Sequence, residues 1–147
     1  MLIIGQRGTV GLSSNQIDRC KLIWKVLNGK DFCPLDYSEA TAHGSKTRFN
    51  QTKNKVILGA DVIPGQGIDS RSRMSEMACL AHEIAHAERF SFGLDRDDNI
   101  PHKLRDEAEA SLHASWNMAL SNKDRADLVE DARDLLIEWL KGDIHES

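Results

Sequence analysis

The sequence contains His82-Glu83-Ile84-Ala85-His86 inside a run of small and apolar residues. Apolar residues at helical spacing, with Ser70 or Ser72 as the capping residue and Gly93 as the stop, predict a helix through about residue 90. The two histidines are four residues apart, so they share one face of this helix, and Glu83 projects beside them. Two imidazoles in this arrangement can bind one zinc ion, and the carboxylate can act on a zinc-bound water. The segment therefore predicts a helix that carries a zinc site.

Amphipathic patterns and turn residues predict an α+β arrangement for the whole chain. A strand-like run at 55–59 follows 46–50 after a four-residue turn, which predicts a β-hairpin. Helical patterns cover residues 14–28, about 102–121 and about 123–141. The chain has no repeat and no long linker, so we expect one compact domain over residues 1–147. In this domain, a small antiparallel sheet packs against about four helices.

The composition is typical of a soluble globular protein and excludes several classes. Of 147 residues, 40% are hydrophobic and 29% are charged, and no apolar run is long enough to cross a membrane. The formal net charge of -4 argues against a nucleic-acid-binding protein. Cys20, Cys33 and Cys79 form no C-x-x-C pair, and the apolar stretch at 2–4 is too short for a secretory signal. We therefore expect a reducing, cytoplasmic location.

A catalytic zinc site needs a third protein ligand, and the helix predicted from about residue 102 offers several acidic and histidine side chains. On a helical wheel, Glu107 falls at the shoulder of the small and apolar face. An acidic side chain at such a position is costly unless it is paired or bound to a metal. Glu109 and His113 fall toward solvent, where an exposed i,i+4 pair is expected. We therefore expect Glu107 as the third ligand, with Glu109 as an alternative.

The apolar residues of the last two predicted helices are expected to face the core. They include Met118 on the helix from about residue 102, and Val129 and Leu140 on the last helix. Trp116 stands at a helical position, as do the other two tryptophans. We expect all three tryptophans in the core rather than in a substrate cage.

The string Glu107-Ala108-Glu109-Ala110-Ser111 begins 21 residues after the second histidine of the motif. Together with the H-E-x-x-H pattern, it resembles the gluzincin metallopeptidases and is most similar to the small ImmA/IrrE-type enzymes. The resemblance covers roughly residues 46–119 and implies a zincin-like peptidase with His82, His86 and Glu107 as zinc ligands. Ser111 stands where such families carry Asp or Asn to orient a zinc-binding histidine, and a hydroxyl can do this less strongly.

The resemblance also implies a use for the predicted hairpin. In zincins, a strand edge beside the active-site helix receives the substrate in extended form, and Lys55 to Gly59 is the candidate here. The hairpin also carries Lys46, Arg48 and Lys53. Charged edge strands ordinarily protect against aggregation, and this is the interpretation we favour over attraction of an acidic ligand.

The expected chemistry is zinc-assisted hydrolysis of an amide, with Glu83 as the general base. The group that stabilises the oxyanion is open among Tyr37, His102, His113 and Arg105. We favour His102, which lies at the start of its helix beside a proline. His102 is also an alternative third ligand, since a His about 16 residues after the motif is similar to the SprT-like ligand set.

These features predict a zinc-dependent metallopeptidase of prokaryotic or phage origin. Its expected partner is a protein or peptide substrate. The chain is either a selective peptidase that recognises one specific partner protein, or a domain whose active site another subunit completes. The alternative is a non-catalytic, zinc-stabilised regulatory or interaction module of a prophage or defence system. Glu83 favours the enzyme, because a purely structural zinc site needs no general base. The net negative charge and the single imidazole pair argue against a metal-dependent nuclease.

Overall fold

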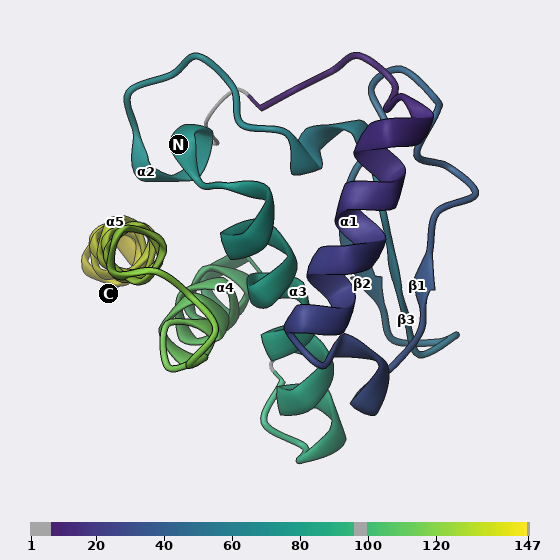
Figure 1. The fold of residues 1–147 in the computed structure, drawn as a ribbon. Coiled ribbons are helices and arrows are strands. Elements are labelled where there is room, and N and C mark those ends of the chain that lie inside the picture. The colour runs from purple at the N-terminus through teal and green to yellow at the C-terminus, as the bar shows by residue number, and fades with distance from the viewer. Residues whose placement is uncertain (1–6, 96–99, 147) are drawn as a thin grey trace.

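Helix α3 (Glu76–Ser91) is the central element of the fold. The sheet and α1 (Ser14–Val26) lie on one side of it, and α4 (Ile100–Ala114) and α5 (Asn122–Glu146) lie on the other (Figure 1). The computed structural model describes residues 7–95 and 100–146. Its shorter segments are the helix α2 (Ser70–Arg73) and the 3-10 turns η1 (Gly29–Asp31) and η2 (Ala60–Val62). The predicted α+β class is confirmed.

The sheet has three short strands in the order β1 (Leu35–Asp36), β3 (Lys55–Ile57) and β2 (Arg48–Asn50). β2 and β3 form the predicted antiparallel hairpin, in which Phe49 stands opposite Val56. β1 runs parallel to β3, so the expectation of a purely antiparallel sheet was wrong. β3 is therefore the central strand, and in the described part of the chain β2 pairs on one side only.

Main-chain and side-chain contacts attach β1 to β3. The Val56 N–H donates to the Pro34 carbonyl at 3.1 Å, and the Leu58 N–H donates to the Asp36 carbonyl at 2.8 Å. Nζ of Lys55 also donates to the Asp36 carboxylate at 2.6 Å. A strand of two residues is too short to show the alternation by which strands are predicted, which explains why the sequence did not indicate β1.

Helix α1 confirms the first predicted helix. Ser13 caps it, because its hydroxyl accepts a hydrogen bond from the Gln16 N–H while the Gln16 side chain accepts one from the Ser13 N–H. This reciprocal pair satisfies two N–H groups that would otherwise lack helical partners. Cys20 and Trp24 are buried on the inner face of α1. Trp24 is thus the one tryptophan whose predicted core position the structure confirms in full.

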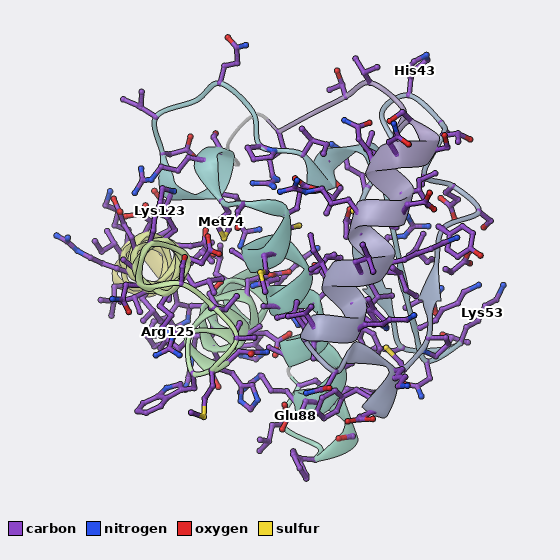
Figure 2. All side chains as sticks on the ribbon, in the orientation of Figure 1. His43, Lys53, Met74, Glu88, Lys123 and Arg125 are labelled. Atoms are coloured by element: carbon purple, nitrogen blue, oxygen red, sulfur yellow. The ribbon has the colours of Figure 1, made fainter. Side chains whose placement is uncertain are left out.

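The helix predicted from Ser70 or Ser72 to about residue 90 is divided into α2 and α3. Met74, labelled in Figure 2, has an extended backbone with φ -54° and ψ 132°. Ser75 then begins a new helix, since its hydroxyl accepts from the Ala78 N–H at 3.1 Å and donates to Asp124 of α5 at 2.7 Å. The prediction of one helix was wrong because a cap that is itself fixed by α5 interrupts the periodic segment.

Helix α4 ends at Ala114, well before the predicted end near residue 121. The following residues form turns, and Trp116 and Met118 are 83% and 91% exposed. Their predicted core positions were wrong, because the apolar face of a helix does not continue beyond its last turn.

The inner face of α5 also differs from the prediction. Val129 and Leu140, expected in the core, are exposed, whereas Leu128 and Leu135 are buried. Leu128 and Val129 are neighbours in the sequence, and neighbours on a helix point about 100° apart around its axis. The buried face of α5 is therefore rotated by about that angle from the expected face. Acidic residues that pair with α2 occupy part of this buried face and obscure its apolar pattern.

None of the helices in residues 7–95 and 100–146 combines the length and the apolar composition that crossing a lipid bilayer requires. The apolar stretch at 2–4, from which we expected no secretory signal, lies outside these described residues. Cys20, Cys33 and Cys79 are free cysteines. Burial is the main cause that raises the pKa of all three thiols, which disfavours the thiolate, the nucleophilic form of cysteine.

Candidate metal centre

Helices α3 and α4 bring three candidate ligands together. His82 and His86 lie one turn apart on α3, and Glu107 of α4 contacts both. Oε2 of Glu107 is 2.6 Å from Nε2 of His82 and 3.0 Å from Nε2 of His86, and the two Nε2 atoms are 3.1 Å apart. Among the described residues, this is the group whose ligand atoms could hold a metal ion.

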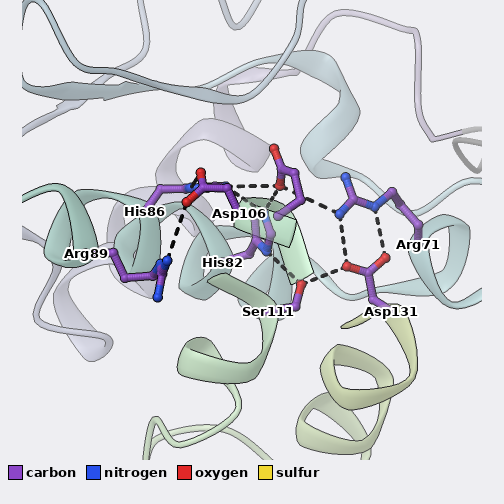
Figure 3. A network of polar contacts seen from close by, with 8 residues as sticks. Arg71, His82, His86, Arg89, Asp106, Ser111 and Asp131 are labelled. Carbon is purple, nitrogen blue, oxygen red and sulfur yellow. Dashed lines mark hydrogen bonds and ion pairs between the residues drawn. The ribbon is translucent and has the colours of Figure 1, made fainter. Parts of the chain in front are cut away.

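The other ring nitrogen of His82 is held by a chain of hydrogen bonds (Figure 3). Nδ1 of His82 lies 2.8 Å from the hydroxyl of Ser111, which donates its proton to Oδ2 of Asp131 at 2.7 Å. A hydroxyl has only one proton, so Ser111 must accept the Nδ1–H of His82. Because Nδ1 carries this proton, Nε2 is the ring nitrogen that faces the point where the three ligand atoms meet, and a metal ion there would take the place of its proton. Ser111 thus orients His82, with Asp131 as the carboxylate behind it.

Asp131 is in turn held by Arg71 of α2. Nε and Nη2 of Arg71 donate to the two carboxylate oxygens of Asp131, both at 2.9 Å, and Nη2 also lies 3.8 Å from Oε2 of Glu107. Burial acts to raise the pKa of Asp131, but the hydrogen bonds and charge of Arg71 outweigh it and hold the pKa below its usual value. Asp131 is therefore ionised and can accept a hydrogen bond from the Ser111 hydroxyl. Arg71 thus lies next to the candidate ligand Glu107 and also holds the carboxylate that supports a second candidate ligand, His82.

Sequence reasoning identified neither Arg71 nor Asp131 as a site residue. A signal was present, because α5 carries acidic residues at helical spacing opposite a short segment rich in Ser and Arg. The structure pairs these side chains as follows: Asp124 with Ser75, Asp127 with Arg73, Asp131 with Arg71 and Asp134 with Ser70. Acidic residues on a buried helix face require such partners, so their spacing could have indicated a contact between the two segments.

The second ring nitrogen of His86 faces an acidic group of its own. Nδ1 of His86 lies 3.6 Å from Asp106, which also lies 3.5 Å from Arg89. Burial lowers the pKa of His86, but the charge and hydrogen bond of Glu107 outweigh burial and raise the pKa to about 9. Burial raises the pKa of Glu107, but the charges of His86 and His82 outweigh it and hold the pKa well below its usual value. The cluster therefore favours positive charge at its centre, which a metal ion can supply in place of a proton.

Glu83 is buried beside the three ligands and lines two cavities. One, of about 270 Å³, is bounded by β2 and α4, and the other, of about 110 Å³, is bounded by η2 and α2. Glu83, Thr47 and Arg71 line both cavities. Burial raises the pKa of Glu83, although the charges of His86 and His82 act in the opposite direction. A carboxyl group whose pKa is raised toward neutrality suits general acid–base chemistry.

No family model, curated protein or solved structure matches this chain. The resemblance to gluzincins therefore rests on the motif residues His82, Glu83 and His86 and on the string that begins at Glu107. The zincin-like fold stays a prediction.

Glu109 and His113 lie away from the three ligand atoms. Glu109 pairs with Arg89 of α3 at 3.1 Å and with Arg105 at 3.5 Å. His113 pairs with Glu88 of α3 at 3.0 Å. The expected exposed pair between Glu109 and His113 was wrong, because each side chain contacts a partner on α3 instead. Glu109 is outside the group of potential ligands that the described residues form.

The four residues considered for the oxyanion also lie elsewhere. His102 is exposed near the start of α4, outside the potential ligand group, and Tyr37 is 46% exposed after β1. The guanidinium of Arg105 lies 4.9 Å from the ring centre of Trp139. None of the four lines either cavity beside Glu83. The structure thus brings the expected base and ligands together, but not the expected oxyanion candidates.

Proposed function

We propose that this chain is a zinc-dependent metallopeptidase that hydrolyses peptide bonds in a selective protein substrate. The observation that carries the proposal is the convergence of His82, His86 and Glu107 beside Glu83, a buried carboxyl group that lines a cavity. Structural zinc sites are almost always completed by four protein ligands, whereas catalytic sites have three and keep one position for water. The three candidate ligands that residues 7–95 and 100–146 bring together fit the catalytic type.

The donor atoms are those that zinc prefers. Two imidazole nitrogens with one carboxylate oxygen form a ligand set of known catalytic zinc sites. Two ligands about 2.1 Å from a tetrahedral ion lie about 3.4 Å apart, and the Nε2 atoms of His82 and His86 are 3.1 Å apart. The hydrogen bond between His82 and Ser111 also directs Nε2 toward the ion, as the partners of zinc-binding histidines do.

Bound zinc would lower the pKa of a water molecule and polarise the substrate carbonyl. Glu83 accepts the proton of the attacking water, holds it on its carboxylate, and donates it to the amine nitrogen that leaves. The burial that raises the pKa of Glu83 brings its two protonation states closer in free energy, so that it can both accept and release a proton.

We place the substrate along β2. The expectation that Lys55 to Gly59 receives it was wrong, because β3 is paired on both sides. β2 pairs with β3 alone among the described strands, and Arg48 and Phe49 of β2 line the same cavity as Glu83. An extended peptide can add to such an edge through backbone hydrogen bonds, with side-chain pockets supplying specificity. An edge of three residues offers few backbone hydrogen bonds, so binding depends more on side-chain contacts that distinguish one substrate from another, as in a selective peptidase.

The substitution Glu83→Gln tests the proposal in the zinc-loaded full chain. We expect the variant to bind zinc as the wild type does, by elemental analysis, and to lose cleavage by at least about 100-fold because it lacks the base. Cleavage is measured as new termini in a proteome-derived peptide library by mass spectrometry. Glu88→Gln, a matched control on the same helix, removes a carboxylate that pairs with His113 and should change neither property. The proposal would be refuted if Glu83→Gln cleaved peptides as fast as the wild type does, or if the wild type bound no zinc.

One observation favours a second function. Arg71 and Asp131 connect α2 and α5 to the ligands of α3 and α4, so zinc would also stabilise the fold. This suits a non-catalytic regulatory or interaction module of a prophage or defence system. In such a module, zinc removal abolishes partner binding and Glu83→Gln has no effect, so the same variant separates the two functions.

A cytoplasmic location fits the proposed enzyme. Cys20, Cys33 and Cys79 are free, as expected in a reducing compartment. The net charge of -4 favours a protein substrate over nucleic acid.

A further inference from the structure

We propose that Arg71 binds the substrate's carbonyl oxygen as that oxygen becomes negatively charged during hydrolysis. The inference rests on the proposed peptidase function and supplies the oxyanion-stabilising group that its chemistry requires. Four observations support it: the position of Arg71, its unused donor, its rigid support and the placement of the other cations.

Arg71 is positioned at the junction of the two cavities. It lines both of them together with Glu83 and Thr47. Its Nη2 atom is 3.8 Å from the Oε2 atom of Glu107 that contacts both histidines. A carbonyl group that lies close enough to Glu83 and the ligands to react is therefore also next to the guanidinium.

The guanidinium has an unused donor. Nε and Nη2 of Arg71 bind Asp131, whereas no described residue accepts a hydrogen bond from Nη1. Figure 3 shows this third nitrogen on the side of the guanidinium that faces away from Asp131. An Arg side chain has five N–H donors, so the two on Nη1 are available to a substrate.

The support of Arg71 is rigid. Two parallel hydrogen bonds to Asp131 fix the plane of the guanidinium, and Asp131 is itself held by Ser111. Donors that are already oriented need no reorganisation when charge develops, which is the condition for strong oxyanion stabilisation.

The other cations near Glu83 are less suitable. Arg7 donates through Nε, Nη1 and Nη2 to the backbone carbonyls of Asp61, Arg71 and Val62. Lys46 and Lys103 line one cavity each, but both are exposed and carry flexible side chains. Arg48 lines only the larger cavity and is exposed, and its guanidinium binds the Lys46 carbonyl and the Glu39 carboxylate. Arg71 is thus the one cation among the described residues that lines both cavities, is held rigidly and has a free donor.

The proposed step balances in atoms and electrons. Water oxygen forms a bond to the carbonyl carbon, Glu83 takes the water proton, and the electron pair of the C=O π bond moves to oxygen. Nη1 of Arg71 donates a hydrogen bond to this negatively charged oxygen. The C=O bond then re-forms, the C–N bond breaks with its electron pair on nitrogen, and Glu83 returns the proton to that nitrogen.

The experiment uses the cobalt(II)-loaded full chain, whose visible absorption reports the geometry of the metal ligands. Benzylphosphonate serves as a tetrahedral oxyanion probe, acetate serves as a planar anion, and calorimetry measures both affinities. We expect Arg71→Lys to weaken phosphonate binding by at least about tenfold and to weaken acetate binding less, because the planar acetate gains no oxyanion for Nη1 to stabilise. The cobalt spectrum reports whether loss of the two-donor support of Asp131 also moves the ligands. The matched control Arg73→Lys lies on the same helix, pairs with Asp127 and lines neither cavity. It should change none of the three measurements.

A second variant guards against a purely structural effect. In Arg71→Ala, millimolar guanidinium chloride should restore at least part of the lost phosphonate affinity, while the same salt should not affect Arg73→Ala. The inference is wrong if Arg71→Lys keeps the wild-type phosphonate affinity, or if its acetate affinity falls as much as its phosphonate affinity. It is also wrong if Arg71→Lys loses cobalt and guanidinium does not restore phosphonate affinity to Arg71→Ala. Failure of the wild type to bind cobalt would instead refute the metal centre itself.

Discussion

The Ser111 hydroxyl of α4 lies 2.8 Å from Nδ1 of His82 on α3 and donates a hydrogen bond to Asp131 of α5. A single hydroxyl therefore connects three helices at the candidate metal centre. The direction of both hydrogen bonds follows from the ionised state of Asp131, which Arg71 maintains. The orientation of the proposed ligand His82 thus depends on residues far from it in the chain.

Ser111→Ala should weaken zinc binding by about 10- to 100-fold, because His82 loses the acceptor that fixes its tautomer. The measurement is a competition titration with a chromophoric chelator. Ser115→Ala is the control, since that hydroxyl donates to a backbone carbonyl beyond the metal centre. Equal zinc affinities for the wild type and Ser111→Ala would show that the hydroxyl does not support the ligand.

Asp131→Asn should destabilise the fold, because it leaves the Arg71 guanidinium without its charged partner. Breaking a fully buried pair costs about 3–5 kcal/mol, and the 22% exposure of the Arg71 side chain reduces our expectation to about 2–3 kcal/mol. Urea unfolding measures the loss. Asp134→Asn, on the same helix, should cost less than about 1 kcal/mol, since Asp134 makes a single hydrogen bond with the Ser70 hydroxyl. A similar cost for the two variants would contradict this account of Asp131.

Chelation of zinc should lower the melting temperature. At a zinc concentration of about 100 times the Kd, binding contributes about 2.7 kcal/mol to the free energy of unfolding. For a domain of this size, that corresponds to roughly 5–10 °C, measurable by differential scanning fluorimetry with and without EDTA. His86→Ala should show no such shift. The metal centre would lose support if EDTA left the wild-type melting temperature unchanged.

The ion pair between Asp36 and Lys55 predicts a pH dependence of stability. Hydrogen bonds to the Asp36 carboxylate lower its pKa below the usual value. The bond from the Lys55 ammonium has the largest effect, and the bond from the Ser38 N–H has the next largest. A carboxyl group with a lowered folded pKa contributes stability above its unfolded pKa of about 3.9, and this contribution is lost as the pH falls through the folded value. Asp36→Asn should therefore cost about 0.5–1 kcal/mol at pH 7, and the difference from wild type should shrink below about pH 4.

Urea midpoints at several pH values measure this dependence. Glu39→Gln is the control, because the Glu39 and Arg48 side chains are each 46% exposed and water weakens their attraction. A constant difference between wild type and Asp36→Asn down to pH 2 would exclude the ion pair as its cause.

Local features of the fold could be predicted from the sequence. The hairpin was confirmed because its two strands are joined by a short turn and need no information from elsewhere. Helix α1 was confirmed because Ser13 and its apolar spacing both lie within one segment. The proximity of Glu107 to the histidines was also expected from its position on a helical wheel.

Features that depend on distant contacts could not be predicted. The parallel pairing of β1 places β3 in the centre of the sheet and makes β1 and β2 its two edge strands, which changes the proposed substrate strand from β3 to β2. The end of α4 at Ala114 exposes Trp116 and Met118, although helical spacing placed both in the core. In each case, a neighbouring segment decided the environment of the residue.

The sequence by itself determined the pair His82 and His86 with Glu83 beside them, because backbone hydrogen bonds between residues four apart set their spacing wherever the helix packs. Only the tertiary structure decided what surrounds that pair. Arg71 and Asp131 are 60 residues apart in the chain and meet because α2 and α5 pack together. Burial then makes their pairing necessary, since an isolated charge at that position would be costly. Helical spacing therefore accounts for the motif, and packing accounts for the polar groups that orient it.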